Sequence, residues 1–314
     1  MNLSPLGPGP EFDKIRRIWQ VLGDRAAFGG DDCAIVQVGK ETLAVSSDMA
    51  IEGTHFESGW LTQYELGWRA GAAALSDLAA VAAEPCGVLV SLGMSREWPD
   101  EFITELMEGV GDVAQSVGAV VWGGDVVRND RLVIDVTVVG TVERAVLRSG
   151  AAVGDTLWVT GSLGGPITAL RAWESRREPE REARERFAHP EPRVAQALWL
   201  RDRGAKALID LSDGLLADTG QLAAASGVQC VINQESIPKH PFTEDHATAL
   251  LSGEEFELLV ALPRDAAADI GDLFKREFAL GLTRIGHTES GSGVSLRLNG
   301  APLELSMSMG YRHF

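Results

Sequence analysis

The sequence predicts a two-domain protein with α/β or α+β layers in both halves. The chain has 314 residues, and one domain takes about 150 residues. Segments rich in β-branched residues alternate with segments of helical pattern, and the strongest strand signal is 132–142. The clearest helix is the alanine-rich segment 62–83, whose small side chains allow close packing against a neighbour.

The first half reads as a mixture of strands and helices. Gly39-Lys40 separates two short β-prone segments and indicates a hairpin. Pro99 favours the first turn of an amphipathic helix. The predicted elements are strands 34–38 and 43–47, helix 62–83, strand 86–92, helix 99–117, and strands 119–122 and 132–142. We expect these elements to form an N-terminal domain over 1–143.

A second domain is predicted over 144–314. Its predicted elements are strand 156–160, a glycine-rich turn at 161–166 leading into a helix, helix 193–203, strand 206–209, helix 215–226, and strands 228–233 and 257–262. Pro179 interrupts the charge run 174–186, which we interpret as a solvated helix end and loop.

Composition excludes several classes of partner. The net charge of −17 argues against nucleic acid or an anionic membrane surface. It does not argue against ATP, because bound metal ions reverse the sign of the local charge.

Cys33, Cys86 and Cys230 form no CxxC pair, which indicates neither a disulfide framework nor a zinc site. No apolar stretch approaches the roughly 20 residues of a membrane span, and no signal-peptide pattern is present. The expected location is the cytoplasm.

Five short acidic motifs carry most of the chemical information. They are Gly29-Gly30-Asp31-Asp32, Ser46-Ser47-Asp48, Ser76-Asp77, Gly123-Gly124-Asp125 and Asp210-Leu211-Ser212-Asp213-Gly214. Most follow an apolar run, where a strand is expected to give way to a loop and where α/β proteins build ligand sites. Several carboxylates in such places favour Mg²⁺ shared with phosphates. Taken singly, most of these motifs are explained equally well by an exposed turn, a strand end or a helix cap.

Two of the motifs point more strongly to a site. Asp77 lies in an apolar, alanine-rich helix without another charge, and a buried carboxylate is costly unless it is paired or bound to metal. A structural salt bridge is the alternative. Asp210 and Asp213 flank Ser212 at the start of a predicted helix. A simple N-cap explains one of these aspartates but not both with the serine.

Familiar phosphate-binding motifs are absent. The chain contains no G-x-x-x-x-G-K-[ST] loop, no H-R-D loop and no calcium-binding loop. Two glycines before Asp125 would let backbone N–H groups approach a phosphate, and Arg128 would face the same anion. Taken alone, His55 reads as a structural histidine, Arg148 as a surface arginine and Glu254 as solvated charge.

Together the motifs resemble the thiamine-monophosphate kinases, a family of the aminoimidazole ribonucleotide synthetase superfamily. The resemblance extends from about residue 11 to residue 314. It is carried by Gly-Asp-Asp-Cys-Ala (30–34), Ser-Ser-Asp (46–48), Gly-x-His-Phe (53–56), Leu-Ser-Asp-Leu-Ala-Ala (75–80), Gly-Gly-Asp (123–125), Arg-Ser-Gly (148–150), Gly-Asp (154–155), Asp-Leu-Ser-Asp-Gly (210–214), Gly-Glu-Glu-Phe-Glu-Leu (253–258) and Gly-Tyr-Arg-His-Phe (310–314). Val126, Ser252, Glu255 and Pro10 depart from the family's usual pattern.

The resemblance implies a fold and a set of site residues. An N-terminal domain would pair its sheet with a second subunit into a β-barrel in a homodimer, and a C-terminal α/β domain would close the ATP site. Several Mg²⁺ ions would be held by Asp32, Ser46, Ser47, Asp48, Asp77, Asp125, Asp210 and Asp213. ATP would contact Gly124, Asp125, Arg148 and Ser212. Thiamine monophosphate would contact His55, Glu254 and Tyr311.

The implied reaction transfers the γ-phosphoryl group of ATP to thiamine monophosphate, giving thiamine diphosphate. The acceptor phosphate has a second pKa of about 6, so at neutral pH it needs no general base. It needs cancellation of repulsion between two anions, which positioning and bound metal supply. Tyr311 would stack on an aromatic ring of the acceptor, and Glu254 would pair with its positive charge.

Two alternatives stay open at this point. One is another ATP-dependent enzyme of the superfamily that acts on an amidine, selenide or carbamoyl acceptor. The other is a non-catalytic nucleotide- or metal-binding protein on the same fold. The presence of every aspartate in the implied metal set argues against the second alternative.

Overall fold

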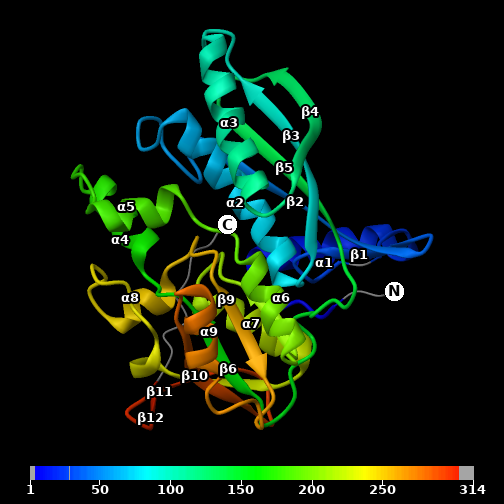
Figure 1. The fold of residues 1–314 in the computed structure, drawn as a ribbon, viewed down its shortest axis with the longest axis vertical. Coiled ribbons are helices and arrows are strands. Elements are labelled where there is room, and N and C mark those ends of the chain that lie inside the picture. The colour runs from blue at the N-terminus through cyan, green and yellow to red at the C-terminus, as the bar shows by residue number, and fades with distance from the viewer. Residues whose placement is uncertain (1–3, 28, 304–314) are drawn as a thin grey trace.

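The computed structural model describes residues 4–27 and 29–303, and these residues form two β-sheets with helices packed against them (Figure 1). The first sheet has five strands in the order β1-β2-β5-β3-β4. Only β3 and β4 run parallel to each other. In chain order the strands are β1 (Ala34–Val38), β2 (Glu41–Ile51), β3 (Glu84–Met94), β4 (Val120–Arg128) and β5 (Val133–Thr141).

The two faces of the first sheet differ. Buried and partly buried residues alternate along β5, where Ile134, Val136 and Val138 face the core. Helices α2 (Gln63–Ala80) and α3 (Asp100–Ser116) cover this face, as Figure 1 shows in its upper half. The opposite face has no cover in the described chain, and every residue of β4 is exposed.

Helix α2 begins where the sequence indicates. Thr62 accepts a hydrogen bond from the N–H of Glu65, and the Glu65 carboxylate accepts one from the N–H of Thr62. The alanine-rich character allows close approach to α3: a Cβ added at Gly109 would lie 2.0 Å from the carbonyl oxygen of Tyr64. The predicted helices 62–83 and 99–117 are therefore confirmed. Helix α1 (Pro10–Leu22), which precedes the first sheet, was not predicted.

The second sheet has seven strands in the order β12-β11-β8-β10-β6-β9-β7. Its strands are β6 (Thr156–Thr160), β7 (Ala207–Asp210), β8 (Gln229–Asn233), β9 (Leu258–Leu262), β10 (Leu282–Glu289), β11 (Gly293–Leu298) and β12 (Ala301–Leu303). The helices of this half are α4 (Gly165–Glu174), α5 (Arg181–Ala188), α6 (Val194–Asp202), α7 (Leu215–Ser226), α8 (His246–Leu251) and α9 (Ile270–Phe278). Strands β6 to β9 and helices α6 and α7 match predicted segments. No described helix has the length and apolarity needed to cross a bilayer.

Helices α4 and α5 connect the two halves. Phe187 of α5 belongs to the hydrophobic core that α2 and α3 build with the first sheet. Arg184 pairs with Glu65 at 2.6 Å, and Trp173 stacks on Trp60 with the ring centroids 5.1 Å apart. The prediction of a solvated end and loop over 174–186 is therefore wrong for residues 181–186, because α5 has an apolar side that packs on α2.

Two strands run further than the sequence indicates. β2 continues to Ile51, so Asp48 lies within a strand rather than at its end. β4 continues to Arg128, so Gly123-Gly124-Asp125 is part of the strand and does not follow it. Backbone pairing with β3 outweighs the local turn signal of the two glycines: Gly124 lies opposite Val90, and Asp125 lies opposite Ser91.

Candidate active site

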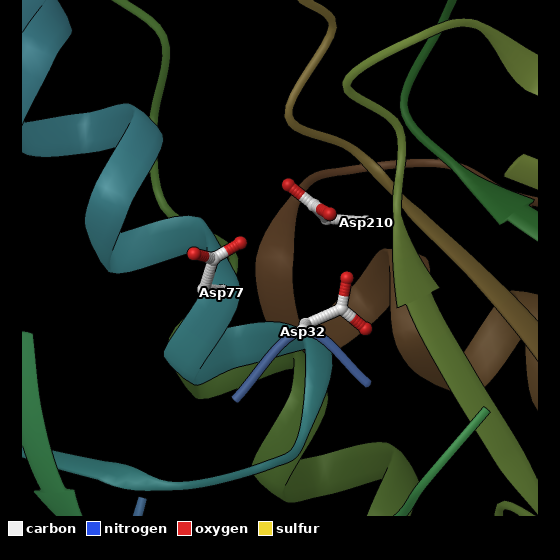
Figure 2. A group of neighbouring side chains, drawn as sticks. All are labelled: Asp32, Asp77 and Asp210. Carbon is white, nitrogen blue, oxygen red and sulfur yellow. The ribbon is translucent and has the colours of Figure 1, made fainter. Parts of the chain in front are cut away.

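Three aspartates from distant parts of the sequence converge between the two halves. Asp32 precedes β1, Asp77 lies on α2 and Asp210 ends β7. One carboxylate oxygen of each lies within 4.8 Å of the others. Figure 2 shows the three side chains around one common space, with the last turns of α2 on one side. The sequence prediction that these residues share a site is consistent with this geometry.

Hydrogen bonds hold each carboxylate in place. The hydroxyl of Ser46 donates to Asp77 at 2.5 Å, and that of Ser76 donates to Asp210 at 2.6 Å. Nη2 of Arg148 donates to one oxygen of Asp32 at 2.6 Å. The other oxygen of Asp32, Oδ2, is buried and has no hydrogen-bond partner in the described chain. The cluster therefore keeps acceptor capacity that no protein donor satisfies.

Burial and repulsion between neighbouring carboxylates disfavour the ionised forms of Asp77, Asp210 and the adjacent Asp31. Burial, and next the charge of Asp210, raise the pKa of Asp77. Burial and the charge of Asp32 raise the pKa of Asp210 to about 8. Burial raises the pKa of Asp31 to about 7, with Asp32 adding to the effect and Arg148 opposing it. A cation placed among these groups would remove both penalties.

The donor set fits a hard divalent cation. All three groups of the cluster offer oxygen. Asp77 comes from a helix, Asp210 from a strand and Asp32 from the segment before β1, and one oxygen of Asp32 lacks a hydrogen-bond partner. Oxygen-only coordination is what Mg²⁺ takes in proteins, usually with phosphate oxygens completing the shell.

A polar pocket lies beside the cluster. Its volume is about 220 Å³. Ala73 stands one helical turn before Asp77, and Ser212 and Asp213 follow Asp210 by two and three residues, so neighbours of two cluster residues line the pocket. The lining residues are Glu11, Asp48, Met49, Ala50, His55, Arg69, Ala70, Ala73, Ser212, Asp213, Glu254 and Phe256.

A second, more apolar pocket of about 360 Å³ adjoins the first. Trp60, Ile167, Leu170 and Leu251 supply its apolar wall, together with Thr54, Gly253 and Glu174. His55 and Glu254 line both pockets. The two cavities therefore form one elongated site with a charged end and an apolar end.

His55 has a defined orientation at the boundary between the pockets. The backbone N–H of Ile51 donates to its Nδ1 at 3.0 Å. Because Nδ1 accepts this hydrogen bond, the neutral ring carries its proton on Nε2. His55 thus presents an N–H donor, which suits an anionic or carbonyl-type oxygen.

The loop 252–257 brings Glu254 to the site in an uncommon conformation. Glu254 has φ 59° and Phe256 has φ 51°, both in the left-handed region that residues with a Cβ seldom adopt. The N–H of Glu254 donates to the carbonyl of Ser212 at 2.6 Å, which ties this loop to the segment after β7. The Glu254 carboxylate pairs with Arg69 of α2. Backbone strain of this kind is common at ligand sites.

Asp218 is a buried acid that the sequence motifs did not reveal. Its Oδ2 accepts the N–H groups of Asp213 and Gly214 at 3.2 and 3.0 Å. Burial, with the charge of Asp213 next, raises its pKa. Asp218 therefore binds the two backbone N–H groups that immediately precede α7. A signal was present in the spacing, since Asp218 follows Asp210-Leu211-Ser212-Asp213-Gly214 by one helical turn.

Among the described residues, not every predicted site residue lines the two pockets. Ser47 faces the open side of the sheet and donates to Asp135 at 2.8 Å, because alternation along β2 separates it from Ser46 and Asp48. Gly124 and Asp125 lie on the exposed edge strand β4, outside the lining of both pockets. Arg148 contacts Asp31 and Asp32. Tyr311 lies outside the described residues.

The departures from the family pattern have distinct surroundings. Glu255 is buried, and its Oε1 accepts the N–H of Gly164. Ser252 is buried at the end of α8, whereas Val126 is 58% exposed on β4. Pro10 is the first residue of α1. None of these residues belongs to the carboxylate cluster.

The fold and this carboxylate site define an AIR synthase related protein of two domains. The model of the AIR synthase related protein N-terminal domain matches residues 30–142, and that of the C-terminal domain matches residues 152–299. A solved structure described as AaThiL complexed with AMPPCP and TMP has a TM-score of 0.86 to this chain at 28% identity, and covers 98% of this chain and 97% of that one.

The curated relatives narrow the class to one family. The thiamine-monophosphate kinase of Pyrococcus abyssi is 30% identical over 289 residues, which is 90% of each chain. That of Methanopyrus kandleri is 34% identical over 289 residues, or 88% of each chain. The chain belongs to the thiamine-monophosphate kinase family.

Proposed function

We propose that this protein is a thiamine-phosphate kinase that transfers the γ-phosphoryl group of ATP to thiamine monophosphate. The observation that carries the proposal is the convergence of Asp32, Asp77 and Asp210 beside a pocket that also contains His55 and Glu254. The relative described as AaThiL binds an ATP analogue, AMPPCP, together with TMP, and its fold superposes on nearly the whole of this chain.

The residues in the pocket fit a reaction without a general base. The acceptor phosphate is already largely dianionic at neutral pH. Among the described residues that line the polar pocket, the only groups able to accept a proton are carboxylates and His55, whose Nδ1 is occupied by the N–H of Ile51. The protein's task is then to hold donor and acceptor in line and to offset their charge.

Asp32, Asp77 and Asp210 would hold Mg²⁺, with Asp48 and Asp213 at the adjoining pocket wall as further ligands. Bound Mg²⁺ would neutralise phosphate charge and align the phosphates. Arg148 and Ser212 would contact ATP, and Arg148 already lies against the cluster through Asp32. His55 and Glu254 would contact thiamine monophosphate.

We further propose a homodimer closed through the first sheet. β1 pairs only with residues 41–45 of β2. Among the described strands, residues 46–51 therefore pair only with β5. β4 pairs only with β3, and its Val120, Trp122, Val126 and Val127 are each more than half exposed. Such an apolar edge is an aggregation hazard unless another strand covers it. Two copies that pair β4 with the partner's β2 would close a barrel.

This arrangement would also place Asp125 at the site. Asp125 lies in register with Met49, but β3 and β5 stand between them, so about 14 Å separates β4 from β2 in one chain. A metal ion reaches its oxygen ligands at about 2.1 Å. Gly124 and Asp125 of one copy would therefore lie beside β2 of the other copy, with Asp125 on the same face of the sheet as Ser47 and Met49.

The decisive experiment is turnover with purified protein. Incubation with ATP, Mg²⁺ and thiamine monophosphate is expected to give thiamine diphosphate and ADP in equal amounts, with no product when Mg²⁺ is chelated. Thiamine, which lacks the acceptor phosphate, is the matched control and should give no product. ATP hydrolysis without thiamine diphosphate would overturn the proposal. The cytoplasmic location stays a prediction.

A further inference from the structure

Arg69 is a pocket residue that the sequence motifs did not indicate. It lies on α2 two turns before Asp77, and only 6% of its surface is exposed. It is the one Arg or Lys among the described residues that line the polar pocket. The other ionisable side chains there are His55, Glu11, Asp48, Asp213 and Glu254. An anion that enters this pocket therefore depends on Arg69, on His55 and on bound metal.

The guanidinium is held in one orientation by three partners. Nη1 donates to the carbonyl of Phe187, and the Phe187 ring lies beneath the guanidinium carbon at 3.7 Å. Nη2 pairs with the carboxylate of Glu254. An arginine fixed by stacking and by a carbonyl presents its remaining N–H groups as a preformed fork, the geometry that suits phosphate.

The carboxylate of Glu254 occupies the position of an anion at Arg69. Glu254 also lines the apolar pocket, whose lining includes neither Asp48 nor Asp213. Its loop has the left-handed φ of 59°, so its conformation is imposed by surrounding contacts rather than by local preference. A phosphate monoester carries more charge than a carboxylate and binds an arginine fork in the same bidentate manner.

We propose that Arg69 binds the phosphate of the acceptor, and that Glu254, its partner in this structure, gives way to that phosphate and turns to the cationic part of the acceptor in the apolar pocket. The inference rests on the proposed function. It explains why the polar and apolar pockets share Glu254. An acceptor with an anionic end and a cationic ring would replace the Arg69–Glu254 pair by two pairs, one between Arg69 and the phosphate and one between Glu254 and the ring. An acceptor without the phosphate would leave Glu254 on Arg69.

The competing explanation is a purely structural ion pair between the two halves of the chain. Arg184 and Glu65 form such a pair at 2.6 Å between α5 and α2, outside both pockets. Arg184→Gln is therefore the matched control, because it removes a bridging Arg–Glu pair whose two residues do not line the polar pocket. A structural role for Arg69 predicts that the variants at 69 and 184 behave alike.

The first test compares steady-state constants. Arg69→Lys keeps the charge but loses the fork, and Arg69→Met removes both. We expect the KM for thiamine monophosphate to rise about 10-fold in the first and about 100-fold in the second, since a charge-assisted hydrogen bond contributes about 1.5–3 kcal/mol. The KM for ATP should change less than about 3-fold. Arg184→Gln should lower thermal stability and leave both KM values near those of the wild type.

The second test uses inorganic phosphate as a competitor of thiamine monophosphate at saturating ATP. Glu254→Gln removes the resident carboxylate and should lower the phosphate inhibition constant several-fold, whereas Arg69→Lys should raise it. Unchanged inhibition in both variants, or an equal rise of both KM values in Arg69→Lys, would overturn the role of Arg69. A wild-type protein that makes no thiamine diphosphate would overturn the proposed function instead, so the two failures are distinguishable.

Discussion

At the scale of single residues, the site concentrates negative charge that the protein alone does not neutralise. Asp32, Asp77 and Asp210 share one space, and Arg148 donates a hydrogen bond only to Asp32 among these three carboxylates. Burial of such groups costs free energy unless a cation or a hydrogen-bond donor compensates it. Uncompensated, these buried charges lower the stability of the protein, and a bound divalent cation would recover that cost.

Asp77→Asn tests this balance. The change keeps the shape of the side chain and its contact with Ser46 but removes one charge from the cluster. We expect kcat/KM to fall by about 100-fold or more, the loss typical of one stabilising group removed from a preorganised site. The thermal midpoint without metal should stay equal or rise, because repulsion with Asp210 is relieved.

Mg²⁺ should raise the thermal midpoint of the wild type more than that of Asp77→Asn, which gives a readout independent of turnover. Asp112→Asn, at an exposed position on α3, is the control and should match the wild type in both measurements. Full activity in Asp77→Asn would contradict the metal-cluster interpretation.

Glu255 gives the protein a pH-dependent stability. Burial raises its pKa from the ordinary 4.5 to about 7, although Arg186 opposes the shift. Because the folded state binds the proton more tightly, the contribution of Glu255 to stability is complete below pH 4.5 and is lost as pH rises through about 7. A shift of this size corresponds to about 3 kcal/mol.

Glu255→Gln should remove this loss of folding stability with rising pH. Urea unfolding between pH 4.5 and 8 is expected to show a free energy of unfolding that falls less steeply with pH than in the wild type. Glu97→Gln, at an exposed loop position, should keep the wild-type slope. Identical slopes in all three proteins would refute the assignment to Glu255.

At the scale of elements, α2 is the helix that organises the site. Its first half carries Arg69, its second half carries Ser76 and Asp77, and both halves face the second sheet or its loops. Its opposite side lies against α3 at glycine contacts, where Gly67 approaches Leu106 and Gly109 approaches Tyr64 backbone to backbone. The position of α2 therefore depends on residues without side chains.

Gly109→Ala tests this contact. The new Cβ would lie 2.0 Å from the carbonyl oxygen of Tyr64, so the helices must separate. We expect a loss of about 1–3 kcal/mol in the free energy of unfolding, the usual cost of overpacking. Gly111→Ala, two residues on in α3, meets no atom within 4 Å and should stabilise the protein by up to about 1 kcal/mol. Equal effects of the two substitutions on chemical denaturation would argue against the close contact.

At the scale of the whole molecule, neither half contains a complete site. The first half supplies Asp32, Asp48 and Asp77, and the second half supplies Asp210, Asp213 and Glu254. The open face and the free edges of the first sheet leave room for a second copy, which would bring Asp125. The site proposed here thus draws on two units of one chain and on the edge strand of another.

Val127→Glu addresses the dimer. Val127 is 54% exposed and shares the open face of the sheet with Asp125, so the single chain tolerates a charge there. Inside a closed barrel the same carboxylate would be buried, and we expect light scattering to report monomers. Val153→Glu, at a position 63% exposed in the second half, should leave the dimer intact. A monomeric wild type would contradict the proposal.

Mixing two inactive variants locates Asp125. In random heterodimers of Asp77→Asn and Asp125→Asn, one site of each heterodimer would hold both intact residues if Asp125 comes from the partner. About a quarter of the wild-type activity should then return after the subunits are exchanged. If both residues serve the same chain, every site keeps one defect and no activity returns.

The sequence determined the chemistry and the local elements. The order and spacing of the motifs identified the family, and the alanine-rich composition of 62–83 located α2, because these signals are carried by residues close together in the chain. Tertiary structure decided what depends on distant pairing. Strand β3 draws Gly124 and Asp125 into an edge strand, alternation along β2 turns Ser47 away from Ser46, and packing of α5 on α2 brings Phe187 beneath Arg69. The pairing of Arg69 with Glu254 has no local signature, since the two residues lie far apart in sequence and meet only when the two halves pack together.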